Sequence, residues 1–520
     1  MATAQRIIPN LYRDSVSLMQ FSEKIAKLPG VRQASAVMAT ENNIGLLVEA
    51  GLLASASPPS PNDLLIVVEA EETDAAELAL DKAENTLKQK PTASLDSEAR
   101  KTPPRSIEMG LAEMPGANLA LISTPGDYAA AEALKALRLG LHVMLFSANV
   151  SVDDEVMLKR YAREHNLLVM GPDCGTAIIN GAPLGFANVV RRGDIGIVAA
   201  SGTGLQQVAS LIHRYGGGIT QAIGIGGHDL SARVGGISML QGIDALAVDP
   251  GTKVIVLISK PPAPNVMKVV LDKAACSGKP VVVDFLGADP ASFSGKAIHG
   301  VKTLEDASAT AVALAAGKPA PNLSDTLSPT LTKLTGDLRS QLAEGQKYVR
   351  GLFSGGTLCF ETLLLLGESL GEVYSNSPLQ PEFKLPDVWK SQKHMAIDLG
   401  DDLFTQGRPH PMIDFRLRNE RMAQEARDPE VAVILLDVVL GYGSHMDPAG
   451  ELLPAITEAR LIAEKAGRKI VFIGSVCGTD SDPQNLPHQE QMLREAGVHL
   501  VDSNAKSARL AAAIVNPMKA

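Results

Sequence analysis

Residues 195–229 read IGIVAASGTGLQQVASLIHRYGGGITQAIGIGGHD, and this stretch decides the fold. Two runs of β-branched and small apolar residues, at 195–200 and 219–223, each end in a glycine-rich turn. The segment between them has the apolar spacing of a helix. The stretch therefore predicts a strand, a helix and a second strand, with both glycine turns at one edge of a sheet.

The two turns predict an anion site. Glycine lets the backbone approach a ligand closely, and the helix after Gly204 starts with unpaired N–H groups and a positive dipole end. One such turn is a weak signal, because many strand-to-helix loops are glycine-rich only for geometry, but two on one edge are a stronger one. The candidate phosphate-binding residues in this stretch are Ser201, Gly202, Thr203, Gly204, Gly226 and Gly227.

Length and composition limit the class of protein. The chain has 520 residues, of which 45% are hydrophobic, and a net charge of −10. This length predicts roughly three to four domains. An acidic chain with no basic block is a poor partner for nucleic acid or an anionic membrane. The four cysteines lack metal-binding spacing, and no apolar run reaches the ~20 residues that cross a bilayer, so we expect a cytoplasmic protein with free thiols.

Further along the chain, apolar strands alternate with helices, which predicts α/β domains with parallel sheets covered on both faces. One pattern occurs twice, at Asp249-Pro250 and at Asp428-Pro429, each before an apolar strand, and predicts two similar flavodoxin-like domains. The predicted domains are 1–90 (a small α+β domain with no recognisable chemistry), 115–192, 193–317 and 345–520. Proline-rich stretches at 90–115 and 317–331 are predicted linkers.

Ligands of parallel sheets bind at the carboxyl ends of the strands. In the domain 115–192, those predicted ends carry Ser123, Ser147, Asn149, Gly171 and Pro172. No GxGxxG motif with a downstream acidic residue is present, which counts against an ordinary NAD site. We expect no NAD, haem or zinc.

Three motifs resemble the α subunit of succinyl-CoA synthetase. They are Gly171-Pro172-Asp173-Cys174, Ser201-Gly202-Thr203 and Gly224-Ile225-Gly226-Gly227, in the order and spacing of its GPNC, SGT and GIGG motifs. The region from 345 onward is similar to the C-terminal domain of that enzyme's β subunit. Over its full length, with RGLFSGGTLC, LISKPPAP and DLGDDLFTQGRPHPMID, the chain resembles the FdrA family of acyl-CoA synthetase-like proteins, in particular its YahF branch.

The resemblance implies a Rossmann-like domain at 115–192 that binds CoA, with the strand-end residues named above as its contacts. It also implies two flavodoxin-like domains that hold a phosphorylated group between helix N-termini. The second half of that phosphate cradle is expected at Gly400, Asp401, Asp402, Thr405 and Gly407. Asp401 and Asp402 are either Mg²⁺ ligands or helix-capping and turn residues.

The chain departs from the relatives where they carry a phosphohistidine. Their GHAGA loop is replaced by Ala288-Asp289-Pro290-Ala291 and then SFSGKAIHG, with His299 near it but out of register. Either His299 or His228 is a candidate replacement. The ATP-grasp half of the β subunit is also missing. We therefore expect a homo- or hetero-oligomer that needs other subunits, encoded nearby, rather than a self-sufficient ATP-dependent ligase.

The candidate catalytic residues are Arg408 and His410. An arginine can form two hydrogen bonds to a carboxylate or phosphate, and a protonatable histidine beside it suits acyl or carbamoyl phosphate chemistry. Lys260, His445 and Asp447 follow predicted strands and are either anion or ligand contacts or solvated side chains.

Three functions stay open from the sequence. The first is an acyl-CoA synthetase subunit in which an acyl phosphate, CoA and phosphate meet at paired glycine turns. The second is a subunit of an oxamate-type carbamoyltransferase that forms carbamoyl phosphate by phosphorolysis. The third is a non-catalytic ligand-binding scaffold. Full-length resemblance favours the first, whereas the missing ATP-grasp and GHAGA elements favour the second.

Overall fold

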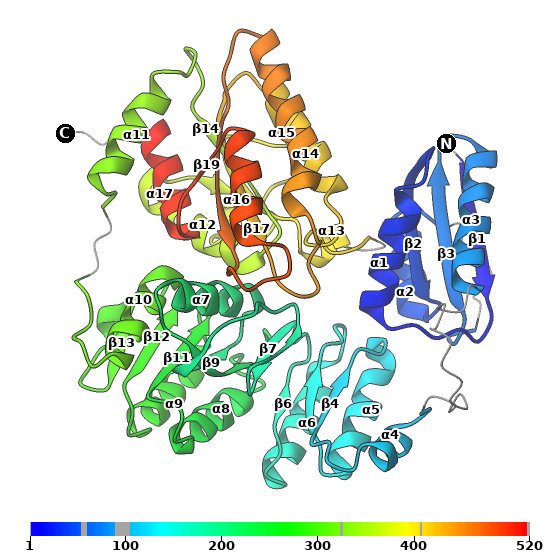
Figure 1. Ribbon diagram of the computed structural model, residues 1–520, viewed down its shortest axis with the longest axis vertical. Helices are drawn as coiled ribbons and strands as arrows, with labels where there is room; N and C mark the ends of the chain where they lie inside the picture. The colour runs from blue at the N-terminus through cyan, green and yellow to red at the C-terminus, as the bar shows by residue number, and fades with distance from the viewer. Residues whose placement is uncertain (1, 54–59, 89–103, 323–325, 406–407, 517–520) are drawn as a thin grey trace. The chain divides into compact units, whose positions relative to one another are not determined.

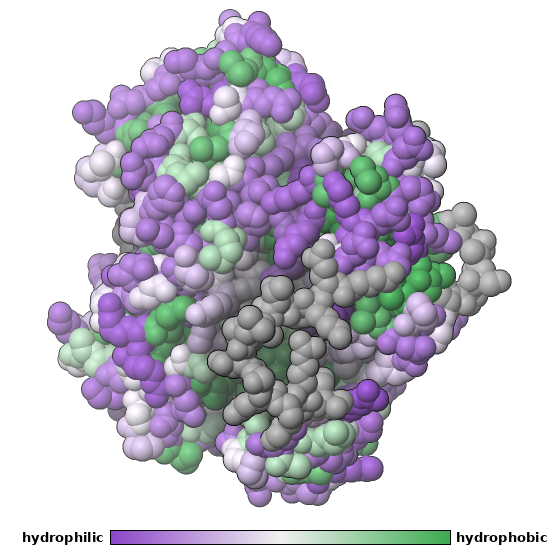
Figure 2. Space-filling model, turned by 45° about the vertical axis from the view of Figure 1, so that its right-hand side comes forward, coloured by the Kyte–Doolittle hydropathy of each residue, from purple (hydrophilic) through white to green (hydrophobic). Residues whose placement is uncertain are grey.

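The computed structural model describes residues 2–53, 60–88, 104–322, 326–405 and 408–516, and Figure 1 gives the order of their helices and strands. The chain forms two compact units. The first unit is Met1–Asp173 with Asp402–Asp414, and the second unit is Cys174–Asp401 with Phe415–Ala520. No helix within the described ranges is long and apolar enough to cross a membrane. Hydrophilic residues cover most of the face drawn in Figure 2, with hydrophobic residues in small groups between them.

The N-terminal part of the first unit is a three-stranded antiparallel sheet in the order β1-β3-β2. Residues 64–68 of the central strand β3 are all apolar, and helices cover both faces of this strand. Leu64, Ile66 and Val68 enter one apolar cluster, and Leu65 and Val67 enter another. The elements are β1 (Ala2–Ile8), α1 (Ser15–Ala26), β2 (Val31–Met38), α2 (Glu41–Glu49), β3 (Leu64–Ala70) and α3 (Thr73–Lys88). The predicted small α+β domain is confirmed.

A second sheet of the first unit is parallel, in the order β4-β5-β6. Its strands alternate with helices, as the apolar pattern predicts. The elements are α4 (Ile107–Glu113), β4 (Leu119–Ile122), α5 (Gly126–Arg138), β5 (His142–Leu145), α6 (Val152–Glu164) and β6 (Val169–Met170). Alanines of α5 pack against β5 in a single apolar cluster.

The second unit begins with a seven-stranded sheet, in the order β13-β12-β11-β9-β10-β7-β8. Its strands are β7 (Thr176–Ile179), β8 (Ala182–Gly185), β9 (Arg192–Ala199), β10 (Ile219–Gly224), β11 (Val254–Ser259), β12 (Val281–Phe285) and β13 (Ile298–Gly300). Its helices are α7 (Gly202–Arg214), α8 (Ile237–Val248), α9 (Pro264–Ala275) and α10 (Leu304–Ala315). Helices α7 and α10 cover one face and α8 and α9 the other (Figure 1). The predicted boundary between residues 192 and 193 falls inside this sheet, after the first residue of β9.

The C-terminal sheet is parallel throughout, in the order β15-β16-β14-β17-β18-β19. Its strands are β14 (Tyr348–Phe353), β15 (Val373–Tyr374), β16 (His394–Asp398), β17 (Val431–Val439), β18 (Val471–Cys477) and β19 (Val498–Leu500). Its helices are α11 (Pro329–Arg339), α12 (Gly356–Leu370), α14 (Arg416–Arg427), α15 (Pro448–Lys465), α16 (Leu486–Glu495) and α17 (Asn504–Val515).

Two sets of five strands share one strand order. When each set is numbered along the chain, β9–β13 of the middle sheet and β14 with β16–β19 of the C-terminal sheet both have the order 2-1-3-4-5. This is the flavodoxin-like order, so the prediction of two similar flavodoxin-like domains is confirmed. One linker prediction is partly wrong. Helix α11 begins at Pro329, inside the stretch 317–331, because the Ser328 side chain accepts the Leu331 amide and proline fits a first helical turn.

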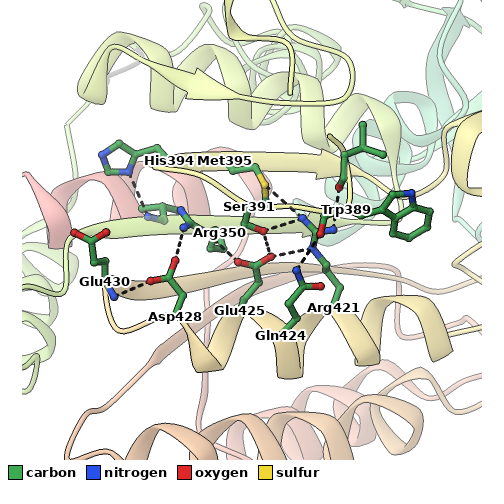
Figure 3. A network of polar contacts seen from close by, with 12 residues as sticks. Arg350, Trp389, Ser391, His394, Met395, Arg421, Gln424, Glu425, Asp428 and Glu430 are labelled. Carbon is green, nitrogen blue, oxygen red and sulfur yellow. Dashed lines mark hydrogen bonds and ion pairs between the residues drawn. The ribbon is translucent and has the colours of Figure 1, made fainter. Parts of the chain in front are cut away.

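Helix α14 is strongly polar, RLRNERMAQEAR, yet it buries Arg418, Arg421 and Glu425. Figure 3 shows how this is balanced. Arg350 of β14 donates to Glu425 Oε2 at 3.0 Å and to Asp428 Oδ2 at 2.7 Å, and Arg421 donates to Glu425 Oε1 at 2.9 Å. Buried charges are tolerated when they are paired in this way. The network thus fixes α14 against the sheet.

Candidate functional site

The N-termini of α7 and α12 meet in the second unit. Each helix follows the first strand of its own flavodoxin-like sheet, β9 or β14. Ser201 Oγ and Thr357 Oγ1 are 2.5 Å apart, and the Thr357 amide donates to Thr203 Oγ1 at 3.2 Å. Two glycine turns from two separate sheets are therefore in direct contact.

At the α7 end, the amides of the first turn are mostly unused. Ser201 Oγ caps the helix by accepting the Gly204 amide at 2.9 Å, and the first turn holds no acidic residue. Within the part of the chain that the structure describes, the Gly202 and Thr203 amides have no acceptor. An anion can accept from both, and the helix dipole favours it there.

At the α12 end, a carboxylate of the protein accepts the amides of the preceding turn. Asp437 of β17 accepts from the Ser354 amide at 2.8 Å and from the Gly355 amide at 2.7 Å. Ser354 Oγ donates to it at 3.0 Å, and Arg418 Nη1 donates to Asp437 Oδ1 at 2.8 Å. Asp437 and Arg418 are 0% and 1% exposed, so this ion pair lies inside the protein.

A second carboxylate lies beside α12. A methyl group at Gly356 would lie 2.5 Å from Asp398 Oδ2, so the Asp398 carboxylate is in direct contact with the first residue of the helix. Burial raises the pKa of Asp398 to about 7, although the positive charge of Lys260 opposes the shift. Lys260 Nζ lies 5.2 Å from the centre of the Phe360 ring, so this lysine of the middle domain reaches α12. Burial also raises the pKa of the Cys359 thiol, which disfavours a thiolate there.

The second predicted turn of the middle domain lies beside the first. Strands β9 and β10 are parallel neighbours, and the Ile225 amide donates to Ala199 O at 2.9 Å, so both turns are at one edge as expected. Gly226 has φ +82°, which favours glycine, and His228 next to Gly227 is exposed.

The predicted C-terminal half of the cradle is divided between the two units. The Gly400 amide donates to Asp398 Oδ1 at 2.9 Å and the Asp401 amide to Asp398 O, so these residues form a turn at the end of β16. Asp402 and Thr405 bound the short helix α13 (Asp402–Thr405), which groups with the first unit. Gly407 lies outside the described residues. A cradle that joins Thr203 to Thr405 stays a prediction.

The predicted catalytic pair also belongs to the first unit. Arg408 Nη2 donates to Gln33 Oε1 at 3.1 Å, and His410 Nδ1 accepts the Met412 amide at 3.2 Å. Arg408 thus contacts strand β2, and the contact of His410 is within its own loop. A catalytic role for them stays a prediction.

The predicted cofactor contacts lie at the carboxyl ends of three neighbouring strands. Strands β4, β5 and β6 are neighbours; Ser123, Gly171 and Pro172 come within two residues of the ends of β4 and β6, and Ser147 and Asn149 lie in the loop between β5 and α6. Ser147 Oγ donates to Thr124 O at 2.5 Å, whereas the buried hydroxyl of Thr124 has no partner among the described residues. A methyl group at Gly126 would lie 2.5 Å from Ala148 O, so the backbone is closely packed where α5 begins.

The remaining histidine and metal candidates are weaker. His299 lies in the edge strand β13, opposite Val282, rather than in a loop. Asp447 caps α15 by accepting the Gly450 amide at 3.1 Å, and His445 accepts the Asp447 amide at 3.0 Å. Across the described ranges, no group of three His, Cys, Asp or Glu side chains could hold a metal ion. Mg²⁺ at Asp401 and Asp402 stays a prediction.

One part of the junction is not among the predicted phosphate-binding residues. Thr357, the second residue of α12, contacts Ser201 and Thr203. The signal was present, because Ser354-Gly355-Gly356-Thr357 follows an apolar strand as Ser201-Gly202-Thr203 does.

Two sheets with a shared flavodoxin-like strand order, and glycine turns in contact at paired helix N-termini, form the arrangement that the resemblance to CoA ligases predicts. Models of known families match two regions: "CoA-ligase" matches residues 352–514, and "CoA binding domain" matches residues 190–287, in the middle domain rather than at 115–192, where the resemblance places CoA. The chain is 48% identical to the uncharacterized protein YahF of Escherichia coli (strain K12), over 97% of both chains. It belongs to the family of that protein, the FdrA family.

More distant relatives match only parts of the chain. The α subunit of the ADP-forming succinate–CoA ligase of Aquifex aeolicus is 34% identical over 28% of this chain and 48% of its own length. The chain thus spans about half the length of that relative. A dinucleotide-forming acetyl-coenzyme A synthetase 1 of Ca. Korarchaeum cryptofilum is 15% identical, covers 76% of this chain and 82% of its own, and has a TM-score of 0.28, which carries no argument about the site.

The N-terminal domain matches a third family model, "AllF, heavy metal-associated domain", over residues 1–103. Those residues contain no cysteine and no histidine. Thiolate and imidazole ligands for a metal ion are therefore absent from these residues, whereas thioether sulfur is present at Met19 and Met38. The relatives named here include no carbamoyltransferase.

Proposed function

We propose that the chain is an acyl-CoA synthetase subunit, of the succinate–CoA ligase kind, that binds the phosphoryl group of an acyl phosphate at the N-terminus of α7. The single observation that carries the proposal is the contact between the turns 201–203 and 355–357. This contact holds Ser201 and Thr203 in place while the Gly202 and Thr203 amides stay available.

The chemistry follows from the charge at this end of α7. When an acyl phosphate gives up its acyl group, negative charge collects on the departing phosphate oxygens. Backbone amides and a helix dipole that already point at those oxygens stabilise that charge without rearranging. Lys260, at the end of β11, adds a positive charge on the same side of the sheet.

CoA suits the edge of the sheet β4-β5-β6. The buried, unpaired hydroxyl of Thr124 is a hydrogen-bond donor that a ligand can satisfy, and Ser123, Ser147, Asn149, Gly171 and Pro172 would surround it. Bound CoA supplies the thiol that receives the acyl group. The missing ATP-grasp and GHAGA elements imply that a further subunit makes the acyl phosphate.

Calorimetric titration with inorganic phosphate tests the α7 site. Gly202→Leu should weaken phosphate binding at least about tenfold, because its side chain fills the space in front of the free amides. Gly367→Leu, on the distal part of α12 where a Cβ meets nothing within 4 Å, is the matched control and should bind as the wild type does. Equal phosphate affinity in both variants would disprove the α7 site.

The same titration separates the alternatives. CoA binding together with phosphate binding supports the synthetase. Binding of carbamoyl phosphate without CoA would support the carbamoyltransferase instead. A melting temperature that none of the three ligands raises would support a scaffold.

A further inference from the structure

The turn that precedes α12 is built to hold an oxyanion, and a side chain of the protein already fills it. The Ser354 amide, the Ser354 hydroxyl and the Gly355 amide all donate to the Asp437 carboxylate, at 2.7 to 3.1 Å. A turn whose donors converge on one carboxylate is an anion-binding nest. Here the anion is part of the chain.

Arg418 adds an independent observation at the same place. It is 1% exposed, and its Nη1 donates both to Asp437 Oδ1 and to Asp437 O. Its Nε and Nη2 have no hydrogen-bond partner among the described residues. A buried guanidinium with unused donors strengthens the preference of this turn for negative charge.

The two helix ends therefore differ in charge. Two carboxylates lie at the α12 end: Asp437, and Asp398 against Gly356. The positive charges near them are those of Arg418 and Lys260. Neither helix has an acidic residue in its first turn, so the ends differ in that a carboxylate accepts from the turn before α12, whereas the Gly202 and Thr203 amides of α7 have no acceptor among the described residues. A second anion at the α12 end would meet two carboxylates and find the nest amides occupied.

We infer that Asp437 is a resident anion that determines specificity: it leaves α7 to bind the phosphoryl group, and it restricts the substrate to an acyl group without a second negative charge. This rests on the proposed function, because it assumes that the acyl group of the bound substrate lies against α12. The substrate class is then an acyl phosphate with a neutral acyl chain, rather than one derived from a dicarboxylic acid.

Two stable phosphonates of similar size test the inference. Ethylphosphonate carries a neutral chain, and phosphonoacetate carries an added carboxylate. Calorimetric titration of the full-length wild-type protein should find ethylphosphonate bound at least about tenfold more tightly. Phosphonoacetate that binds equally or more tightly would overturn the inference.

Asp437→Asn sharpens the test by removing the resident charge while keeping the side-chain shape. The freed nest and the Arg418 guanidinium should then raise phosphonoacetate affinity at least about tenfold and leave ethylphosphonate within about threefold. An unchanged ratio of the two affinities in a folded variant would also overturn the inference. If the variant does not fold, the wild-type comparison decides.

These results separate the inference from the function beneath it. If wild-type protein binds neither phosphonate nor phosphate, the proposed α7 site itself is wrong. If all three bind, and Gly202→Leu abolishes that binding while phosphonoacetate is preferred, the α7 site stands and only the role of Asp437 fails.

Discussion

The two flavodoxin-like halves of the second unit share a strand order but treat a buried aspartate in opposite ways. Asp437, on β17 of the C-terminal half, accepts from two backbone amides, a hydroxyl and Arg418. Asp284, on β12 of the middle half, is equally buried, and neither of its oxygens has a partner within the described residues. The same fold thus holds one carboxylate as a fixed charge and leaves the other unpaired.

The difference teaches what each half contributes to the junction. A fixed negative charge beside a helix N-terminus interacts favourably with the dipole of that helix, so α12 needs no external anion. No carboxylate accepts from the Gly202 and Thr203 amides of α7, which have no acceptor among the described residues, although the first turns of both helices lack an acidic residue. Similar topology therefore does not give similar sites, because single side chains at the strand ends decide the local charge.

The largest expected effect on stability comes from removing Arg418, the charged partner of Asp437. Arg418→Leu removes one partner of a buried ion pair and leaves Asp437 uncompensated, so it should lower the free energy of unfolding by about 3–5 kcal/mol. Urea denaturation followed by circular dichroism measures the loss. The double variant Arg418→Leu with Asp437→Leu should recover part of it, since no unpaired charge is left. A loss below about 1 kcal/mol for the single variant would contradict a fully buried pair.

A smaller effect is expected from the unpaired aspartate, and it depends on pH. Burial raises the pKa of Asp284 well above its usual value, and the carboxylates of Glu361 and Asp306 add to the shift. The pKa of Glu361 is itself raised to about 7 by burial. The folded protein therefore keeps these protons to a higher pH than the unfolded chain does. Stability is highest below pH ~4 as far as these groups contribute, and falls as pH rises through their folded-state pKa values.

Asp284→Asn tests this contribution. It should reduce the loss of stability between pH 5.5 and pH 8, because an amide cannot ionise and the folded variant no longer holds the raised-pKa proton that the unfolded chain gives up. Denaturant titrations at the two pH values give the difference. Asp272→Asn, whose side chain in the same half is 66% exposed, is the control and should leave the wild-type pH dependence unchanged. A variant as pH-sensitive as the wild type would mean that Asp284 ionises normally in the folded protein.

The sequence predicts the strands and helices of both halves well, because their apolar runs and glycine turns are local signals. It predicts the α7 turn for the same reason. It does not predict α14 as a packed helix, since Arg418, Arg421 and Glu425 look solvated until their partners on β14 and β17 are known. The pairing of Ser201 with Thr357 is likewise hidden, because the two residues are far apart in the chain and meet only once both sheets have formed.

The smallest expected effect compares the two helix starts directly. A methyl group at Gly356 would lie 2.5 Å from Asp398 Oδ2, whereas one at Gly202 would lie 3.3 Å from Thr176 Oγ1. Gly356→Ala should therefore cost about 1 kcal/mol, at the low end of overpacking costs, because the carboxylate end of Asp398 can shift. Gly202→Ala should be nearly neutral, since alanine also favours a helix and Thr176 needs to move only slightly.

Thermal unfolding of the two glycine variants, measured in parallel, distinguishes two reasons for glycine at position 356: contact with the Asp398 carboxylate, or a requirement of the α12 backbone. If the Asp398 carboxylate is what fills the space at Gly356, then Gly356→Ala combined with Asp398→Ala should unfold no earlier than Asp398→Ala alone. Purely additive losses would instead mean that the backbone of α12, and not the neighbouring carboxylate, requires glycine. In that case the contrast between the two helix ends rests on Asp437 and Arg418 alone, and Asp398 has no part in it.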